Sequence, residues 1–379
     1  MKLTDVVDRI NGNVDRFTTE LEYYIGGEHF ESNELEVTQK GLLKENLGKL
    51  GFKFHFAFQD RDVVFMARNP HLRKAGMVRF AGLCSDASYI LRSKDETVLS
   101  QEYLAVMLQS DHFWDYCESH KVGSVNFANN WSSIANYEFE LPTPEEQKEI
   151  SDKVWAAYRL KKSYKKLLAA TEEMVKSQFI EMFYNEKYPL QKLKTHIDVV
   201  RGVSYKPVDI KEAGSYRSSV ILRSNNIDNG QINFDDVVYV DNRRVTKEQV
   251  LSKGDIVMCG SNGSKKLVGK AAMINEIPSY RTSFGAFCIG IRCKESILPK
   301  YLSVYFQTSK YRDVIEFLGS GSNILNIKPE HIYNLEIPIP SLEDQKHFVS
   351  IAEQADKSGF ELRKSIDAID AVIKSLINN

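Results

Sequence analysis

Cysteine is scarce in this chain, with five residues among 379, and no two of them form a Cys-x-x-Cys pair. An odd number of thiols without such spacing argues against a disulfide framework and against a structural zinc site. Free thiols fit a reducing compartment such as the cytoplasm. The eight histidines also lack the spacing of metal ligands. We therefore expect no metal and no cofactor on this chain.

Long apolar runs are lacking as well. No stretch approaches the ~20 apolar residues that cross a bilayer, and the first residues lack the apolar segment of a signal peptide. The composition, 42% hydrophobic and 27% charged, is typical of a soluble globular protein. A length of 379 residues suits two domains of ~150 residues with connecting elements. We expect a cytoplasmic protein that makes no membrane contact.

The net charge is only −1, which argues against a non-specific nucleic-acid coat. The charge is distributed unevenly along the chain. Residues 1–143 carry 15 Lys and Arg against 21 Asp and Glu, whereas residues 187–340 carry 22 against 15. The two halves therefore differ in the sign of their charge.

Catalytic motifs are absent too. The segment Gly260–Lys265 does not meet the GxxxxGK[ST] spacing of a phosphate loop. The segments Glu146-Gln147-Lys148 and Asp344-Gln345-Lys346 resemble nuclease motifs but lie at predicted helix starts, without a suitable metal-binding acid before them. No NPPY-type amino-methyltransferase motif and no glycine-rich S-adenosylmethionine loop is present. We therefore predict a protein that is not an enzyme.

An internal repeat organises the chain, which matches itself at an offset of 198 residues without gaps. In the first stretch the identical pairs are Tyr103/Tyr301, Leu104/Leu302, Val106/Val304, Gln109/Gln307, Asp115/Asp313 and Glu118/Glu316. In the second stretch they are Ile134/Ile332, Asn136/Asn334, Glu138/Glu336, Pro142/Pro340, Glu145/Glu343, Gln147/Gln345 and Lys148/Lys346. So long a series in one register indicates a duplication.

A long helix is predicted after each repeat, over residues 144–186 and 341–379, because proline or serine and then acids open both segments. Heptad spacing continues from there for 35–40 residues, or roughly 55–60 Å. Lys161 and Gly359 interrupt the two stripes. The residues expected to pack the helices on each other or on a partner are Gln147, Ile150, Val154, Leu168, Gln345, Phe348, Leu362, Ile366, Ile369 and Ile373. Ordinary long core helices are the alternative.

Each long helix follows a body with mixed strands and helices. Strands are predicted at 23–27, 62–66, 219–222, 237–240 and 255–258, and single helices at 103–116 and 301–317. The predicted fold class is α/β, with two similar domains, 1–143 and 187–340, separated by two long antiparallel coiled-coil-like helices. The lysines at 161, 162, 165 and 166 are predicted to form a solvated helix face, or else to contact DNA phosphates or an acidic partner.

An acid-free loop follows the same predicted strand in both bodies, over residues 63–85 and 256–275. Basic side chains there suit phosphates, and Asn, Ser and Arg can reach base edges. The candidate DNA contacts of the first body are His29, Arg68, Asn69, His71, Arg73, Lys74 and Arg79. Those of the second are Arg223, Ser224, Asn225, Asn226, Ser261, Asn262, Ser264, Lys265 and Lys266. Solvated surface loops, and for His29 a structural histidine, are the alternatives.

The repeated proline–glutamine segments resemble a known family. Residues 335–345, with the sequence LEIPIPSLEDQ, are similar to the junction between a target-recognition domain and a conserved helix in the specificity subunits of type I restriction-modification enzymes. Residues 139–147 repeat that junction without its first proline, and the segments 188–190, 222–227 and 260–269 also resemble these domains. The resemblance covers the full length, in the order domain, helix, domain, helix.

The resemblance implies that each domain reads one half of a split double-stranded DNA target and that the helices set the gap between the halves. It also implies partners: two methyltransferase (modification) subunits, which carry S-adenosylmethionine, and motor-nuclease (restriction) subunits, which use ATP and Mg²⁺. Catalysis and cofactors would then belong to these partners. A protein–protein scaffold of two α/β modules on a helical spacer is the alternative, whereas a single-chain restriction-methylation enzyme is excluded by the missing motifs.

The first body departs from the second because it is acidic and has Gly26-Gly27-Glu28-His29 where the second has Leu222-Arg223-Ser224-Asn225. Its DNA affinity is therefore expected to depend on the loop from 68 to 79. Replacing Arg73 and Lys74 by alanine is expected to weaken binding without changing the sequence preference.

Overall fold

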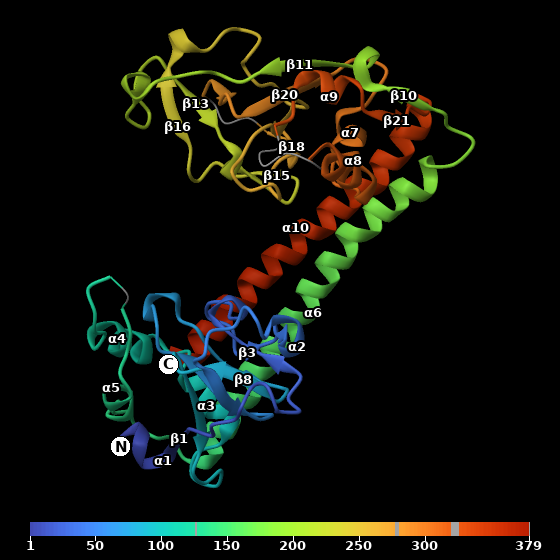
Figure 1. Cartoon of the computed structure of the whole chain (residues 1–379). Helices are drawn as coiled ribbons and strands as arrows, with labels where there is room; N and C mark the ends of the chain where they lie inside the picture. The colour runs from blue at the N-terminus through green and yellow to red at the C-terminus, as the bar shows by residue number, and fades with distance from the viewer. Residues whose placement is uncertain (126, 277–279, 320–325, 379) are drawn as a thin grey trace. The chain divides into compact units, whose positions relative to one another are not determined.

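The computed structural model describes residues 1–125, 127–276, 280–319 and 326–378 (Figure 1). The chain divides into two units, Met1–Lys166 with Arg363–Asn379 and Leu167–Leu362. Each unit contains an α/β body together with one part of each long helix. No helix within the described ranges is long and apolar enough to cross a membrane.

The two long helices are α6 (Pro144–Phe183, 40 residues) and α10 (Leu342–Asn378, 37 residues), as long as the heptad spacing predicts. A capping box opens α6, because the Glu146 carboxylate accepts the Thr143 amide N–H at 2.8 Å and the Thr143 hydroxyl accepts the Glu146 amide N–H at 3.3 Å. The Ser341 hydroxyl accepts the Asp344 amide N–H at the start of α10, at 3.1 Å.

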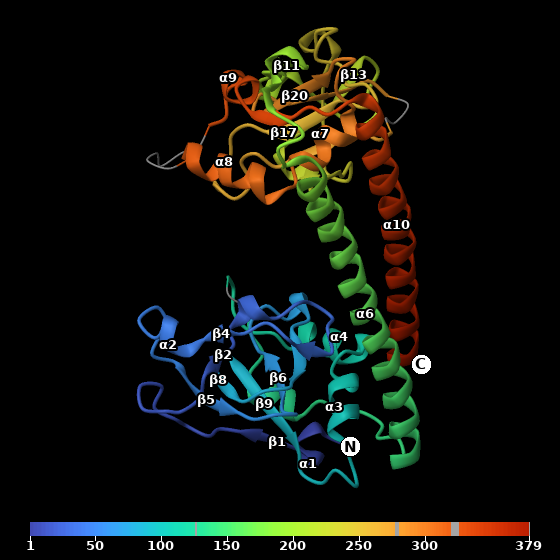
Figure 2. The ribbon, with the colours of Figure 1, turned by 90° about the vertical axis from the view of Figure 1, so that its right-hand side faces the viewer.

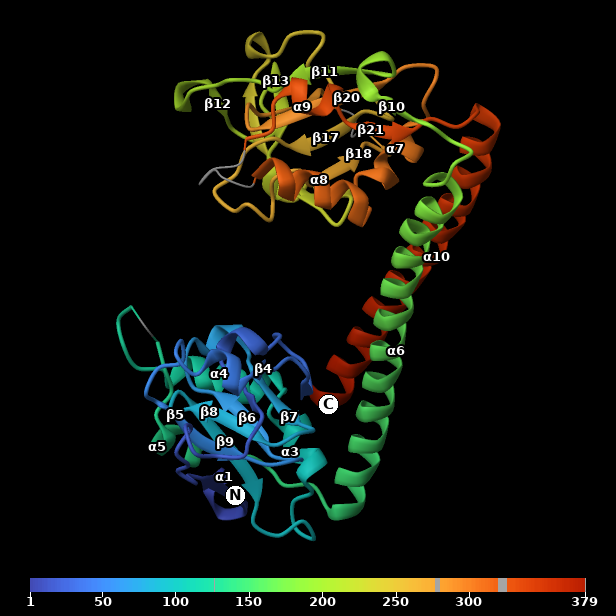
Figure 3. The same ribbon diagram turned by 45° about the vertical axis from the view of Figure 1, so that its right-hand side comes forward.

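The predicted seam exists in both helices, since each position of the two heptad stripes is buried or half-buried. In the first unit, the early part of α6 lies beside the late part of α10, where Lys161 Nζ is 2.6 Å from Asp370 Oδ1. In the second unit, the rings of Phe179 and Phe183 pack on Phe348 with centroids 5.3 and 5.6 Å apart. The helix segments run antiparallel within each unit, as Figures 2 and 3 show.

The first unit holds two sheets, with the orders β1-β9-β6-β7-β3 and β4-β2-β8-β5. The strands of the first sheet are β1 (Val7–Ile10), β9 (Ser88–Ser93), β6 (Val63–Met66), β7 (Ala75–Val78) and β3 (Glu36–Val37). Those of the second are β4 (Gly41–Leu42), β2 (Tyr23–Tyr24), β8 (Gly82–Ser85) and β5 (Phe54–Phe58). The α-helices of this body are α1 (Leu3–Val6), α2 (Leu43–Asn46), α3 (Gln101–Met107), α4 (Asp111–Ser119) and α5 (Trp131–Ala135).

The second unit has the sheet orders β11-β20-β17-β18 and β12-β16-β13-β19, with two small ladders, β10-β21 and β14-β15. The first sheet comprises β11 (Ile197–Arg201), β20 (Cys288–Cys293), β17 (Ile256–Cys259) and β18 (Ala271–Met273). The second comprises β12 (Ile210–Lys211), β16 (Val238–Asp241), β13 (Ser218–Leu222) and β19 (Thr282–Phe284). The remaining elements are β10 (Leu190–Lys192), β21 (Glu336–Pro338), β14 (Ile227–Asp228), β15 (Gln231–Ile232), α7 (Pro299–Tyr305), α8 (Ser309–Gly319) and α9 (Pro329–Tyr333).

The two bodies share the central strand pairings of their sheets, although their edge strands differ. In the first unit β9 pairs antiparallel with both β1 and β6, and in the second unit β20 pairs antiparallel with both β11 and β17. The parallel pair β2/β8 corresponds to the parallel pair β13/β19. An ion pair is repeated as well, between Asp62 and Arg92 and between Asp255 and Arg292. The α/β fold class and the duplication are therefore confirmed.

The single helices predicted at 103–116 and 301–317 are wrong, because each is a pair of helices, α3/α4 and α7/α8. The Ser110 hydroxyl accepts the Phe113 amide N–H at 3.2 Å and caps α4. The Thr308 hydroxyl, 198 residues later, accepts the Tyr311 amide N–H at 3.3 Å. A hydroxyl that caps a new helix competes with continuation of the preceding one. The break therefore belongs to the repeated unit.

Candidate nucleic-acid interface

Three loops of the second unit meet where strands β13, β17 and β19 end. Gly285, after β19, donates its amide N–H to Leu222 O at 2.8 Å, and Gly260, after β17, donates to Phe287 O at 2.9 Å. The Asn262 side chain donates to the Ser224 hydroxyl at 3.0 Å. The structure thus brings together candidate residues that lie 38 positions apart, and forms one polar surface from separate loops.

Asp236 holds the loop that follows β13. Its carboxylate accepts hydrogen bonds from Arg223 Nη2 at 2.8 Å and from Asn225 Nδ2 at 2.7 Å. Asn226 is 1% exposed, and its amide donates to the backbone oxygens of Asn233 and Asp236, both at 2.9 Å. The prediction that Asn226 contacts DNA is therefore corrected, since its side chain is buried and shapes the loop. Arg223 is half-buried and Asn225 is exposed, so both lie nearer the surface than Asn226.

The loop after β17 carries its basic residues outward. The side-chain oxygen Oδ1 of Asn262 accepts the Ser264 amide N–H at 2.9 Å, a short turn typical of asparagine. Ser264, Lys265 and Lys266 that follow are exposed, and Ser261 is half-buried. Exposed lysines next to polar side chains on a rigid turn suit contacts with phosphates and base edges.

In the first unit the corresponding loop follows β6. Arg68, Asn69 and His71 are exposed on it, around the 3₁₀ turn Pro70–Leu72. Asn69 has a φ of 54°, a left-handed conformation that asparagine tolerates, and its amide N–H donates to Phe127 O at 2.9 Å. These three candidates therefore form the accessible part of the first loop.

The other three basic candidates of this loop have partners within their own unit. Arg73 Nη1 is 2.5 Å from Asp111 Oδ1, and this hydrogen bond lowers the pKa of Asp111. Lys74 Nζ donates to Gly27 O at 2.6 Å. Arg79 Nε is 3.2 Å from Glu36 Oε1. Each of these side chains is thus engaged by an oxygen of its own unit, and their contact with DNA stays a prediction.

His29 is a structural histidine. Its Nδ1 accepts the Gly26 amide N–H at 2.9 Å, and its ring packs edge-on against Tyr24 with centroids 5.2 Å apart. Its side chain is only 13% exposed. The structure therefore favours the alternative reading, in which His29 holds the turn after β2.

Of the four lysines on α6, Lys162, Lys165 and Lys166 are exposed as a solvated face requires, whereas Lys161 is buried. Lys161 Nζ lies 3.0 Å from Glu34 Oε1, Lys165 Nζ lies 2.8 Å from the same oxygen, and Lys162 Nζ lies 2.6 Å from Glu36 Oε2. Burial raises the pKa of Glu34, but the hydrogen bonds from Lys165 and Lys161 outweigh it, so this pKa lies below its ordinary value. The sequence prediction did not include the acidic segment of residues 31–36, although three glutamates within six residues were a visible signal.

Metal ligands do not cluster in the parts of the chain that the structure describes, where no group of three His, Cys, Asp or Glu side chains could hold an ion. The five cysteines are free thiols. Burial raises the pKa of Cys259 to about 11, so this thiol stays protonated at neutral pH.

Comparison with known proteins agrees with this geometry. Residues 197–369 match the family model of the type I restriction modification DNA specificity domain. The type I restriction enzyme StySPI specificity subunit of Salmonella potsdam is 40% identical over 167 residues, which are 43% of this chain and 34% of the relative. The match thus spans about a third of the relative's length. Residues 197–369 are therefore similar to a DNA specificity domain of this type.

Two solved structures share the fold over the whole chain. One is a chain from a structure of complex assembly and conformational transition in the type I R-M system, with a TM-score of 0.57, 16% identity, and coverage of 100% of this chain and 95% of that one. The other is the S subunit of a type I restriction-modification system from M. genitalium, with a TM-score of 0.54, 13% identity, and coverage of 100% and 94%. At this identity the likeness establishes the fold.

Proposed function

We propose that this chain is the sequence-specific DNA-binding specificity subunit of a type I restriction-modification complex. It recognises a bipartite double-stranded target and directs adenine methylation and restriction by partner subunits. The observation that carries the proposal is the repeated placement of polar loops: equivalent strands, β6 and β17, end in acid-free loops on two bodies with the same central strand pairings. A duplicated reader suits a target with two half-sites.

Within each body we assign distinct roles to the exposed and half-buried candidates. Asn225, Ser261 and Asn262 are short polar side chains on a surface built by three loops, which suits hydrogen bonding to base edges. Lys265 and Lys266 suit phosphate contacts, as does Arg68 in the first unit. The proposed recognition domains are 1–143 and 187–340.

The proposal also assigns the chemistry to partners. Two methyltransferase subunits would dock on α6 and α10 and bring S-adenosylmethionine, and motor-nuclease subunits would use ATP and Mg²⁺. This chain would then act without catalysis, in the cytoplasm, by selecting the site and positioning the methyltransferase over an adenine flipped from the duplex. The missing methyltransferase and nucleotide-binding motifs support this division.

Methylation mapping tests the proposal. The chain is co-expressed with its methyltransferase subunit in a host that lacks such activity, and modified adenines are located genome-wide. We expect a split motif of two short half-sites with a fixed gap. A continuous motif would show that only one body reads DNA, and no modification despite a stable complex with an active methyltransferase would favour the scaffold instead.

A single substitution sharpens this experiment. Asn262→Ala removes a polar group from the second body and should relax the sequence preference in one half of the motif only, by about 1–3 kcal/mol at the affected base pair if the contact is a good one. Asn69→Ala is the matched variant in the first body and should alter the other half. Changes in both halves from either variant would contradict the assignment of one half-site to each body.

A further inference from the structure

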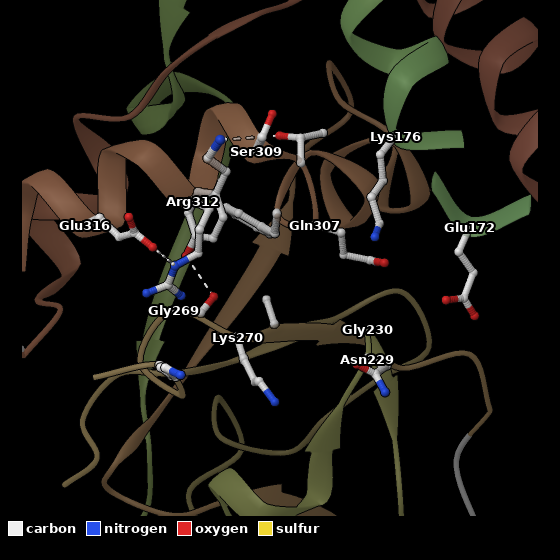
Figure 4. A pocket seen from close by; sticks show the side chains of 15 residues that line it. Glu172, Lys176, Asn229, Gly230, Gly269, Lys270, Gln307, Ser309, Arg312 and Glu316 are labelled. Carbon is white, nitrogen blue, oxygen red and sulfur yellow. Dashed lines mark hydrogen bonds and ion pairs between the residues drawn. The ribbon is translucent and has the colours of Figure 1, made fainter. Parts of the chain in front are cut away.

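A cavity of about 560 Å³ opens in the second unit between α6, the loop after β17 and the start of α8 (Figure 4). Its charged lining consists of Lys176, Lys266, Lys270, Arg312, Glu172 and Glu316. Gln307 and Ser309 also line it, and Figure 4 shows Lys176, Lys270 and Arg312 arranged around these two residues. The cavity therefore combines four cations with two acids.

The lysines of this cavity are only loosely held by acids. Lys176 Nζ is 3.5 Å from Glu173 Oε2, and Lys270 Nζ is 3.8 Å from Asp228 Oδ1, both longer than a strong charged hydrogen bond. Lys266 is exposed and forms no ion pair with any residue that the structure describes. These ammonium groups remain available to an external anion.

The first unit holds an equivalent cavity of about 430 Å³. The offset of 198 residues relates Lys176 to Lys374 and Ser309 to Asp111, and both members of each pair line their respective cavities. The same offset relates Glu172 to Asp370 and Gln307 to Gln109. The two cavities therefore share four equivalent lining positions, and at one of them the aspartate of the first cavity is a serine in the second.

In the first cavity the position equivalent to Ser309 carries a carboxylate, that of Asp111. Asp111 Oδ1 is 2.5 Å from Arg73 Nη1, and Asp111 Oδ2 is 3.5 Å from Lys374 Nζ. Asp111 thus supplies an internal anion to the first cavity, bonded to Arg73 and facing Lys374. Ser309 supplies no such charge in the second cavity.

We infer that the cavity of the second unit binds a backbone phosphate of DNA, and that Asp111 replaces this phosphate in the first unit. The inference rests on the proposed function. It favours DNA over an acidic protein because Lys266 belongs to the acid-free loop after β17, so that the cavity is continuous with the proposed interface. The surplus of Lys and Arg over residues 187–340 also favours a polyanion.

Salt-dependent binding of the full chain, in complex with its methyltransferase, to a duplex with the mapped target tests this inference. Lys176→Ala removes a phosphate ligand, and Ser309→Asp places a carboxylate where Asp111 stands in the first unit. Each should reduce the slope of log Kd against log salt by about 0.9, the loss of one phosphate contact. An acid in the first turn of a helix is favourable, so Ser309→Asp should still fold.

Two matched variants serve as controls. Lys374→Ala removes the first-unit counterpart of Lys176 from a cavity in which Asp111 already supplies the anion, and Ser309→Asn changes size without adding charge. Both should keep the wild-type slope. If the wild-type complex binds the target but the Lys176 and Ser309→Asp variants keep its slope, the inference is overturned while the proposed function stands.

Two further outcomes of these measurements would each have a different meaning. A wild-type complex that shows no preference for the split target would remove the proposed function, and the inference with it. If Lys176→Ala instead weakens association with the methyltransferase, measured by titration without DNA, and leaves the salt slope intact, the cavity holds an acidic protein side chain and the inference is wrong.

Discussion

At the scale of single residues, the most informative side chain is Lys161. It interrupts the apolar stripe of α6, yet it is 6% exposed and lies between Glu34 and Asp370, at 3.0 and 2.6 Å. Burial lowers the pKa of Lys161, but hydrogen bonds to both carboxylates outweigh it and raise the pKa. The interruption in the stripe is therefore a buried ion cluster that joins the body of the first unit to its helices.

Replacing Lys161 by alanine should destabilise the first unit by about 1–3 kcal/mol, because it removes one of the two cations that neutralise the buried Glu34 carboxylate and leaves only Lys165. Chemical denaturation followed by the fluorescence of Trp155, which lies on the same helix, measures this loss. Lys153→Ala is the control, since Lys153 forms an exposed pair with Glu149 and should have little effect. Equal midpoints for both variants would contradict the proposed role of the cluster.

At the scale of elements, a buried glutamine joins each long helix to the body before it. Gln147 accepts the Ser100 amide N–H at 3.0 Å and donates to Val98 O and Pro142 O at 2.8 and 2.9 Å. Gln345 accepts the Leu298 amide N–H at 2.8 Å and donates to Ser296 O and Pro340 O, both at 3.0 Å. All three partners of each glutamine are related by the offset of 198. The glutamine of the repeated proline–glutamine segment therefore has a structural role, since it satisfies buried backbone groups.

Alanine at position 147 or 345 should cost about 3 kcal/mol, because each substitution leaves buried backbone groups unsatisfied at 1–3 kcal/mol each. Hydrogen exchange of the amides of Ser100 and Leu298 reports the two sites separately. Each variant should speed exchange in its own unit and leave the other amide unchanged. Protection that survives either substitution would show that other contacts hold the loop.

At the scale of the whole molecule, the two halves differ in charge and in what their cations do. The first body is acidic, and Arg73, Lys74 and Arg79 are engaged by internal oxygens. The second body is basic, and Lys266 remains exposed. The unevenness in the sequence thus becomes a functional asymmetry in the proposed complex, in which the second body provides most of the phosphate contacts.

Duplexes that keep only one half-site test this asymmetry. A duplex with the half-site of residues 187–340 should bind with a slope of log Kd against log salt that is steeper by about 2 or more than a duplex with the other half-site, since two or more additional phosphates are contacted. The partner subunits are the same in both measurements and serve as the internal reference. Equal slopes would mean that the two bodies contact the backbone alike.

The sequence by itself determined the features that depend on local pattern or on comparison of the chain with itself. The heptad spacing predicted both long helices, and the constant offset predicted two similar bodies. It also placed a polar loop after β6 and after β17. Such patterns can be read along one dimension because helix periodicity and duplication are properties of neighbouring or equally spaced residues. The caps at Ser110 and Thr308 were readable too, although the helices were predicted as continuous.

Only the tertiary structure decided which side chains are paired or buried within the protein and which remain available to contact DNA. Arg73 meets Asp111, Lys161 meets Glu34 and Asp370, and Asn226 is buried beneath its own loop. These partners lie up to 209 positions apart along the chain. The charge of a side chain is written in the sequence, but its neutralisation depends on which distant groups the fold brings within hydrogen-bonding distance. For that reason the surplus of basic residues was predictable, whereas the set of free cations was not.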